Sequence, residues 1–202
     1  MKTEPESSPG PLHGVRVIDL TQFVLGPYAT QTLGDLGADI IKIEEPSGDR
    51  QRHQGKAPKS QNMGPLYVAL NRNKRSVTLD LKTDKGKDAL CKLVRTGDVF
   101  IHNMRPEAIK RLGFGYDDVA ALKPNIVYVE AVGYGSGGPY NGRQAFDDLI
   151  QAASGACDLL PLYDGDKSQI TVQHSKFKDA TSMEAMRIAW KAALGRLANP
   201  IR

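Results

Sequence analysis

The sequence predicts an α/β fold built on a mostly parallel, doubly wound sheet. Short β-branched runs alternate with helical patterns from residue 14 to residue 135, and five runs of the strand type occur in that range. Such alternation is typical of parallel strands joined by crossover helices. Right-handed crossovers would place helices on both faces of the sheet.

The first three strands are predicted at residues 14–20 (GVRVIDL), 38–44 (ADIIKIE) and 75–81 (RSVTLDL). A helix over 28–37 joins the first two strands and ends at a glycine, which is a common C-terminal signal. Residues 45–66 are rich in Gly, Pro and charge without any period. They are predicted to form a long loop, and loops of that length are commonly functional.

The later part of the chain continues the alternation. Its predicted elements are a helix over 83–97, a strand over 98–104, a helix from Pro106, a short helix over 116–124 and a strand over 125–135. Thr83 is a suitable N-cap for the first of these helices, and Pro106 fits the first turn of the next. A glycine-rich loop and two helical stretches follow.

Composition indicates a soluble globular protein. The chain has 202 residues, of which 40% are apolar and 25% charged, and no apolar run reaches the roughly 20 residues that a membrane helix needs. Residues 1–11 are predicted to be a disordered leader, because they are polar and contain proline. Cys91 and Cys157 fit two buried thiols in a reducing compartment, with the cytoplasm as the default.

Several functional classes have little support. The net charge of +4 is mild, and its basic residues are scattered without aromatic interleaving, so nucleic acid is not an expected partner. The histidines and cysteines lack ligand spacing, so no metal is expected. No GxSxG or GxxxxGK[ST] motif is present. The remaining candidates are the carboxylates Asp147, Asp148 and Asp179, for each of which a helix cap is the commoner role.

Four segments together resemble one known family. They are LHGVRVIDLTQFVLGPYATQTLGDLGADIIKIEEPSGD, LNRNKRSVTLDLKTDKGK, HNMRPEAIKRLGFGYDDV and GYGSGGPY. In this order they closely resemble the N-terminal half of class III (CaiB/BaiF-type) CoA-transferases, from about Leu12 to about Gly155. The resemblance is poor from Ala156 to Lys178 and partly resumes in DATSMEAMRIAWKAAL.

The resemblance implies a Rossmann-like large domain, which residues 12–202 would form in part. The family's small domain and C-terminal part would be absent from this chain. In the family two chains form interlocked rings, so a homodimer is expected for the full-length form. The implied substrates are an acyl-CoA and a carboxylic acid, with coenzyme A as the transferred group and no membrane partner.

The resemblance also implies a catalytic role for Asp179, which matches the family aspartate that opens a helix ending in AAL. Its carboxylate would attack the thioester to form a mixed anhydride and then an aspartyl-CoA thioester. Free amides at a helix N-terminus favour the carboxylate anion and negative charge on a tetrahedral intermediate. The cap and the nucleophile are therefore compatible roles. Met183 stands where the family usually has a glycine, and it could crowd the thioester.

Further site residues are carried over from the same resemblance. The positions that contact coenzyme A in the family are Leu79, Lys82, Asn103, Met104 and Arg111, and the two cations suit phosphate groups. Gln22, Phe146 and Asp147 are expected to line the acyl pocket. The formyl-CoA member has an arginine where this chain has Glu45, and Arg50 or Arg52 is expected to substitute for it.

Two alternatives remain open. Acyl-CoA racemases of the same superfamily resemble the sequence nearly as well, but they have a histidine where this chain has Phe146, which cannot carry a proton. A non-catalytic module that binds coenzyme A or assists assembly is the other alternative. It is motivated by the missing half and by the altered segment from Ala156 to Lys178.

Overall fold

A computed structural model describes residues 10–55, 62–143 and 145–154 of the chain. The chain divides into two units, Met1–Ala145 and Phe146–Arg202. All five strands belong to the first unit, and helix α6 (Asp147–Ala153) represents the second unit among the described residues. Each unit is considered by itself below.

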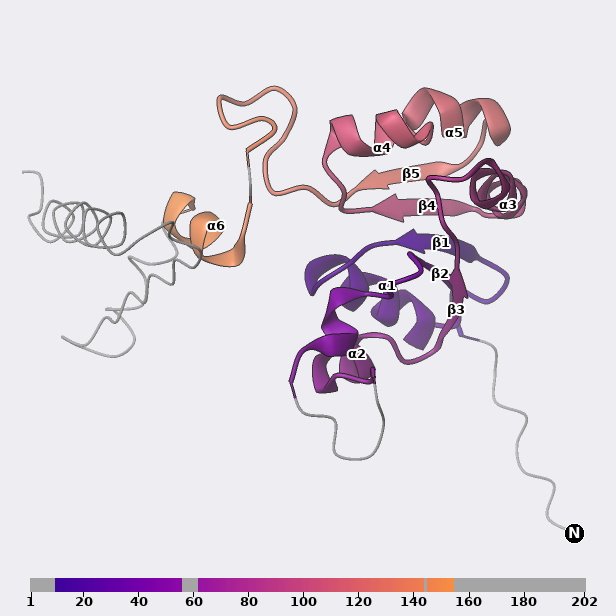
Figure 1. The fold of residues 1–202 in the computed structure, drawn as a ribbon, viewed down its shortest axis with the longest axis horizontal. Coiled ribbons are helices and arrows are strands. Elements are labelled where there is room, and N and C mark those ends of the chain that lie inside the picture. Colours follow the sequence, from indigo (N-terminus) through magenta and orange to yellow (C-terminus); the bar gives the residue numbers. More distant parts are fainter. Residues whose placement is uncertain (1–9, 56–61, 144, 155–202) are drawn as a thin grey trace, which may run out of the picture. The chain divides into compact units, whose positions relative to one another are not determined.

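The first unit contains a parallel sheet. Its strands are β1 (Arg16–Leu20), β2 (Asp39–Glu44), β3 (Lys74–Thr78), β4 (Val99–His102) and β5 (Val127–Glu130). They lie in the order β3-β2-β1-β4-β5, which can be followed in Figure 1, and every neighbouring pair is parallel. The predicted parallel α/β class is confirmed, and each predicted strand is present in a shorter form.

The helices of this unit agree only in part with the prediction. They are α1 (Leu25–Asp35), the 3₁₀ helix η1 (Arg50–His53), α2 (Pro65–Leu70), α3 (Asp84–Val94), α4 (Pro106–Leu112) and α5 (Tyr116–Leu122). The prediction of one loop over 45–66 was wrong, because η1 lies within it and α2 begins at its end. α2 has six residues, and a helix of fewer than two turns cannot display a 3.6-residue period.

The helix termini show why these segments begin where they do. Thr83 caps α3 as predicted, since its Oγ1 accepts a hydrogen bond from Gly86 N at 3.1 Å. Pro106 is the first residue of α4. α1 begins three residues earlier than predicted and contains Pro27 in its first turn, where a missing N–H costs nothing because those amides have no partner within the helix.

Alternate residues of the strands pack on opposite faces of the sheet. One buried cluster consists of Val17, Ala38, Ile40 and Ile101, with Leu33 of α1 packed against it. The other includes Ile18, Ile41 and Phe100 together with Leu90, Val94, Ile109 and Val119 from α3, α4 and α5. Helices therefore cover both faces, as the doubly wound fold requires.

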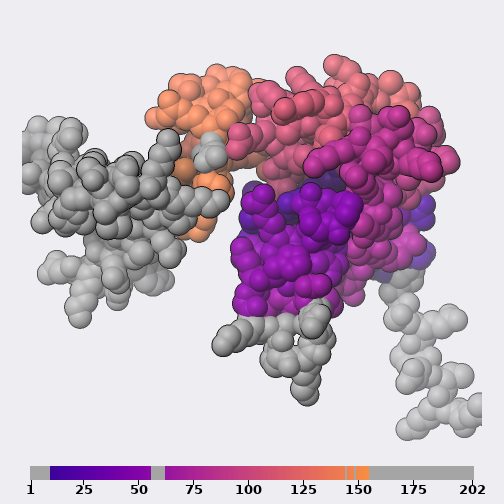
Figure 2. Space-filling model, viewed as in Figure 1, coloured from indigo at the N-terminus to yellow at the C-terminus, as the bar shows by residue number. Residues whose placement is uncertain are grey.

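η1 and α2 lie at the surface of the first unit, where this part of the chain is drawn in purple (Figure 2). Gly64 lies against η1: its N–H donates to the carbonyl of Arg52 at 2.9 Å, and an added Cβ would lie 2.1 Å from the carbonyl oxygen of Gln51. Only glycine permits this approach. No helix in the described ranges is long and apolar enough to span a membrane.

Candidate functional site

The loops that follow β1 and β4 meet at the carboxyl end of the sheet. β1 lies between β2 and β4, so the strand order reverses at this point, and open parallel sheets bind ligands there. Gln22 N donates to Asn103 Oδ1 at 2.9 Å, and Asn103 Nδ2 donates to the carbonyl of Gln22 at 2.7 Å. These two bonds join loops that are 81 residues apart in sequence.

A pocket of about 440 Å³ opens at this junction. It is lined by Gln22, Phe23, Asn103, Met104, Arg105, Glu107, Ala108 and Arg111. Four of the residues that the sequence singled out, Gln22, Asn103, Met104 and Arg111, thus line one pocket. The site carries two exposed cations against one exposed carboxylate, which gives it a positive balance suited to an anionic ligand.

The turn periodicity of α4 explains how this short helix serves both the core and the pocket. Ile109 is fully buried in the core. Glu107, Ala108 and Arg111 line the pocket, and residues three or four positions apart share one side of a helix. Gly113 ends α4 with φ of 84°, a left-handed conformation that glycine adopts without strain.

Phe23 has an unusual backbone conformation at the wall of the pocket. Its φ is 68°, in a left-handed region that bulky side chains rarely occupy. Such strain persists only where the surroundings fix it, and it concentrates at functional sites. The residue is 39% exposed, and the guanidinium carbon of Arg50 lies 5.9 Å from the centroid of its ring. Arg50 is itself exposed and is therefore available to a ligand beside Phe23.

Arg52 is not available in the same way. Its Nε and Nη2 donate to the two carboxylate oxygens of Glu44 at 2.6 and 2.8 Å, and its guanidinium carbon lies 3.9 Å from the ring centroid of Tyr67. Of the two arginines expected to replace the family's phosphate contact, the structure leaves Arg50 exposed and commits Arg52 to an internal ion pair.

Glu44 is the centre of that ion-pair network. Besides Arg52, Ser76 Oγ donates to it at 2.5 Å, Tyr67 OH at 2.9 Å and Asp49 N at 3.0 Å. Burial opposes ionisation of Glu44, but these hydrogen bonds outweigh burial and lower its pKa to about 2. The carboxylate is therefore ionised at neutral pH and fixed in place.

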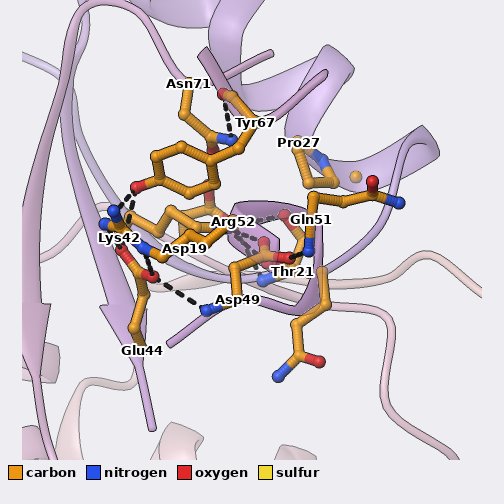
Figure 3. Close-up of polar contacts among 12 residues, drawn as sticks. Asp19, Thr21, Pro27, Lys42, Glu44, Asp49, Gln51, Arg52, Tyr67 and Asn71 are labelled. Carbon is orange, nitrogen blue, oxygen red and sulfur yellow. Dashed lines mark hydrogen bonds and ion pairs between the residues drawn. The ribbon is translucent and has the colours of Figure 1, made fainter. Parts of the chain in front are cut away.

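Two lysines on the neighbouring strands β2 and β3 are almost fully buried, and sequence reasoning missed both (Figure 3 labels Lys42). Lys42 Nζ lies 2.9 Å from Asp49 Oδ2, and Lys74 Nζ lies 3.2 Å from Asp19 Oδ2. Burial lowers the pKa of Lys74 to about 8. For Lys42, the sequence did hold a signal: a lysine inside the apolar strand ADIIKIE. A charge buried in a strand requires a partner of opposite charge, so a nearby carboxylate could have been predicted.

Histidine 102 forms the end of β4, directly before the pocket residue Asn103. It is fully buried, and its Nε2 lies 2.8 Å from Tyr128 OH. Burial lowers the pKa of His102, so its imidazole is neutral at physiological pH. His102 therefore adds no charge next to Asn103.

Two other carried-over positions lie outside the pocket lining. Leu79 follows β3 and packs, partly buried, against the same core cluster as Met104. Lys82 is exposed on the turn before α3, where its backbone N–H donates to Asp80 Oδ1 at 3.0 Å. Both residues belong to the carboxyl end of β3, two strands away from β1.

The remaining predicted residues belong to the second unit or lie outside the described residues. Phe146 is the N-cap residue of α6 and is 58% exposed. Asp147 Oδ2 accepts a hydrogen bond from Gln151 Nε2 at 2.8 Å. Asp179 and Met183 lie outside the described residues.

The sequence matches the family described as CoA-transferase family III over residues 12–197. The chain belongs to this family. Within the described residues, the matched range contains the parallel sheet and the pocket at its switch point, where Arg105 and Arg111 are exposed.

Curated relatives of CoA-transferase family III include three named transferases. Human succinyl-CoA:glutarate CoA-transferase is 38% identical over 157 residues, covering 77% of this chain and 36% of that protein. Formyl-CoA:oxalate CoA-transferase of Streptomyces coelicolor is 41% identical over 155 residues, covering 76% and 37%. A probable fatty acyl-CoA transferase of Mycobacterium tuberculosis, Rv3272, is 39% identical over 168 residues, covering 82% and 42%. The chain thus spans about two-fifths of the length of these relatives.

Solved structures agree with this assignment. The crystal structure of Rv3272 matches with a TM-score of 0.69 and 35% identity, covering 94% of this chain and 51% of that one. A CaiB/BaiF family protein from Brucella suis matches with a TM-score of 0.72 and 30% identity, covering 95% and 51%.

Proposed function

We propose that this protein moves coenzyme A from an acyl-CoA to a carboxylic acid, with Asp179 as the nucleophile. The observation that carries the proposal is the family match over residues 12–197 combined with the pocket at the switch point of the sheet. Curated relatives that are named for CoA transfer between acids support the same reaction class.

Coenzyme A has an anionic end that fits the cations of the pocket. Arg111 and Arg105 are exposed there, and guanidinium groups bind phosphate through paired, charge-assisted hydrogen bonds. Asn103 uses one donor and one acceptor on Gln22. Because a side-chain amide has two of each, Asn103 retains one donor and one acceptor for the ligand.

The proposed reaction splits one exchange between carboxylates into several easier steps. The Asp179 carboxylate attacks the thioester carbonyl, and the C–S bond breaks. Coenzyme A leaves as a thiolate, and Asp179 is left in a mixed anhydride with the acyl group. The thiolate then attacks the aspartyl carbonyl and releases the first acid. The acceptor carboxylate attacks this aspartyl thioester, the C–S bond breaks, and a second mixed anhydride forms. The released thiolate then attacks the acyl carbonyl of that anhydride, which gives the new acyl-CoA and restores the Asp179 carboxylate.

The test is to trap the covalent intermediate in the 202-residue chain. After incubation with an acyl-CoA, hydroxylamine or borohydride should modify Asp179, and peptide mass spectrometry would locate the adduct. The Asp179→Asn variant should give none, whereas the Asp147→Asn variant should still be modified. Mass spectra without an adduct on any carboxylate would refute the proposed mechanism.

The same protein preparations separate the alternatives. Binding of coenzyme A without exchange across a panel of acids would identify a non-catalytic module. Loss of the α-deuteron from a chiral 2-methylacyl-CoA would identify a racemase, in spite of Phe146 at the position of the racemase base.

Assembly and compartment are part of the proposal. The full-length form is proposed to be a homodimer, which light scattering on the purified protein would measure. A reducing, cytoplasmic setting is proposed from the two cysteines, of which Cys91 is a free, half-buried thiol.

A further inference from the structure

Lys42 joins the loop after β2 to the loop after β1 from inside the protein. Its Nζ donates to the carbonyl oxygen of Thr21 at 2.8 Å and lies 2.9 Å from Asp49 Oδ2. The side chains of Lys42 and Asp49 are 1% and 0% exposed. Such a buried pair is costly to desolvate. Its hydrogen bond from Lys42 to the Thr21 carbonyl fixes a backbone group that directly precedes the pocket residue Gln22.

Asp49 fixes the other end of this connection. Its Oδ1 accepts from Gln51 N at 2.9 Å and so caps η1, while its own N–H donates to Glu44 at 3.0 Å. The position of Lys42 is thereby set by a loop that is itself anchored. Figure 3 shows Lys42, Asp49, Glu44 and Thr21 gathered in one polar cluster.

Thr21 is the last fixed residue before the pocket wall. Asp19 Oδ1 accepts from Thr21 N at 2.8 Å and from its hydroxyl at 2.5 Å, so Thr21 is held on both its amide and its carbonyl. The next residue, Gln22, forms the two hydrogen bonds to Asn103, and Phe23 follows with its strained φ of 68°. Thr21 is thus the anchored residue from which the backbone enters the contact with Asn103 and the turn at Phe23.

We infer that Lys42 and Asp49 are a positioning pair, which holds Thr21 so that Gln22 orients Asn103 and Phe23 for coenzyme A. This inference rests on the proposed function, since it concerns the same pocket. Neither Lys42 nor Asp49 lines that pocket, so the pair acts through the loop after β1 and not by contact with the ligand.

Lys74 provides a control of equal burial, which touches the loop after β1 only through Asp19. Its side chain is 1% exposed, and it forms an ion pair with Asp19, whose side chain is 0% exposed. It also donates to Pro27 O and Thr30 Oγ1 of α1, at 2.9 and 2.7 Å. Loss of Lys74 therefore removes a buried charge from the same sheet without removing a direct bond to the residues 21–23.

The experiment compares Lys42→Met and Lys74→Met in the 202-residue chain. Thermal unfolding, the side-chain amide resonances of Asn103 and titration with coenzyme A are measured for each variant. Both variants should lower the unfolding temperature by similar amounts. Only Lys42→Met should shift the Asn103 resonances and, through misorientation of Asn103, weaken coenzyme A binding by about tenfold.

Two results would overturn the inference. One is a folded Lys42→Met protein whose Asn103 resonances match those of the unmodified chain. The other is an equal shift in Lys74→Met. If Lys42→Met does not fold, Asp49→Asn keeps the side-chain volume and should shift the same resonances in the same direction, and their constancy would also overturn it.

The resonance measurement separates this inference from the proposed function. It is made on the free chain, so a shift confined to Lys42→Met supports the positioning pair even if no variant binds coenzyme A. Absence of binding in the unmodified chain would count against the proposed function alone.

Discussion

The two sides of the sheet's carboxyl end use charge in opposite ways. Within β1 and β2 and in the loop after β2, the charged residues Asp19, Lys42, Glu44 and Asp49 are buried and bonded to one another or to nearby backbone. After β4, Arg105 and Arg111 are exposed, and no ion pair involves them within the described part of the chain. Charges of the first kind fix the backbone, whereas charges of the second kind remain available to a ligand.

This contrast predicts that substitutions on the two sides affect different measurements. Removing one partner of a buried ion pair leaves an unpaired charge in a poorly solvated place and lowers stability strongly. Removing an exposed arginine leaves stability nearly unchanged but removes a ligand contact. The following predictions test the comparison in order of expected effect.

Glu44→Ala should cause the largest loss of stability. Five hydrogen-bond donors lose their acceptor in this variant, and we expect the free energy of unfolding to fall by about 3–5 kcal/mol. The neighbouring Glu45 is exposed, so Glu45→Ala should change it by less than about 0.5 kcal/mol. Equal values from urea denaturation of the two variants would show that the buried network adds nothing.

The same carboxylate should make stability depend on pH. Glu44 has a pKa of 4.5 when unperturbed and about 2 in the folded protein, so its contribution is complete above 4.5 and is lost as the pH falls toward 2. The loss should reach up to about 3 kcal/mol. Urea denaturation at a series of pH values should show this slope in the unmodified chain and a shallower one in Glu44→Gln. Parallel curves would contradict the low pKa.

Arg111→Ala should weaken coenzyme A binding by about tenfold, because one charge-assisted contact to phosphate is removed. Its unfolding temperature should not change. Arg95 is an exposed arginine at the C-cap of α3, outside the pocket lining, and Arg95→Ala should bind as the unmodified chain does. Calorimetric titration at two salt concentrations would check this, since screening should reduce the difference. Equal affinities for the two variants would remove Arg111 from the site.

Arg50 and Arg52 should separate binding from stability. Arg50→Ala should weaken coenzyme A binding by about threefold with no change in stability, which is the effect of one exposed charge contact. Arg52→Ala should instead lower the unfolding temperature, because Glu44 and Tyr67 lose their partner. Affinity and thermal unfolding are measured on both variants, and the reverse pattern would mean that Arg52 reaches the ligand.

The sequence predicted the fold well because its signals are local and repeated. Alternating apolar runs and helical patterns were enough to predict the five strands, and Thr83 and Pro106 marked helix starts correctly. α2 escaped prediction because six residues show no period. The predicted helix over 28–37 began three residues too late, since α1 begins at Leu25 and its first turn accepts Pro27.

Site residues were predictable where they follow strands or match a family motif. Gln22, Asn103, Met104 and Arg111 were named in advance and line one pocket, but their functional roles stay predictions, as does the role of Asp179. The conformation of Phe23 could not be predicted, because nothing in its residue type favours a positive φ. The pairing of Lys42 with Asp49 depends on how two loops pack, which no local pattern encodes.

The pairing of β1 with β4 also has a consequence for synthesis on the ribosome. Gln22 and Asn103 are separated by 81 residues, which takes about 4 to 16 seconds to translate. During that interval β1 can pair with β2, but the backbone N–H and C=O groups of its other edge have no partner strand. Unpaired strand edges can pair with other chains, so we expect the nascent protein to be prone to misassembly until β4 emerges.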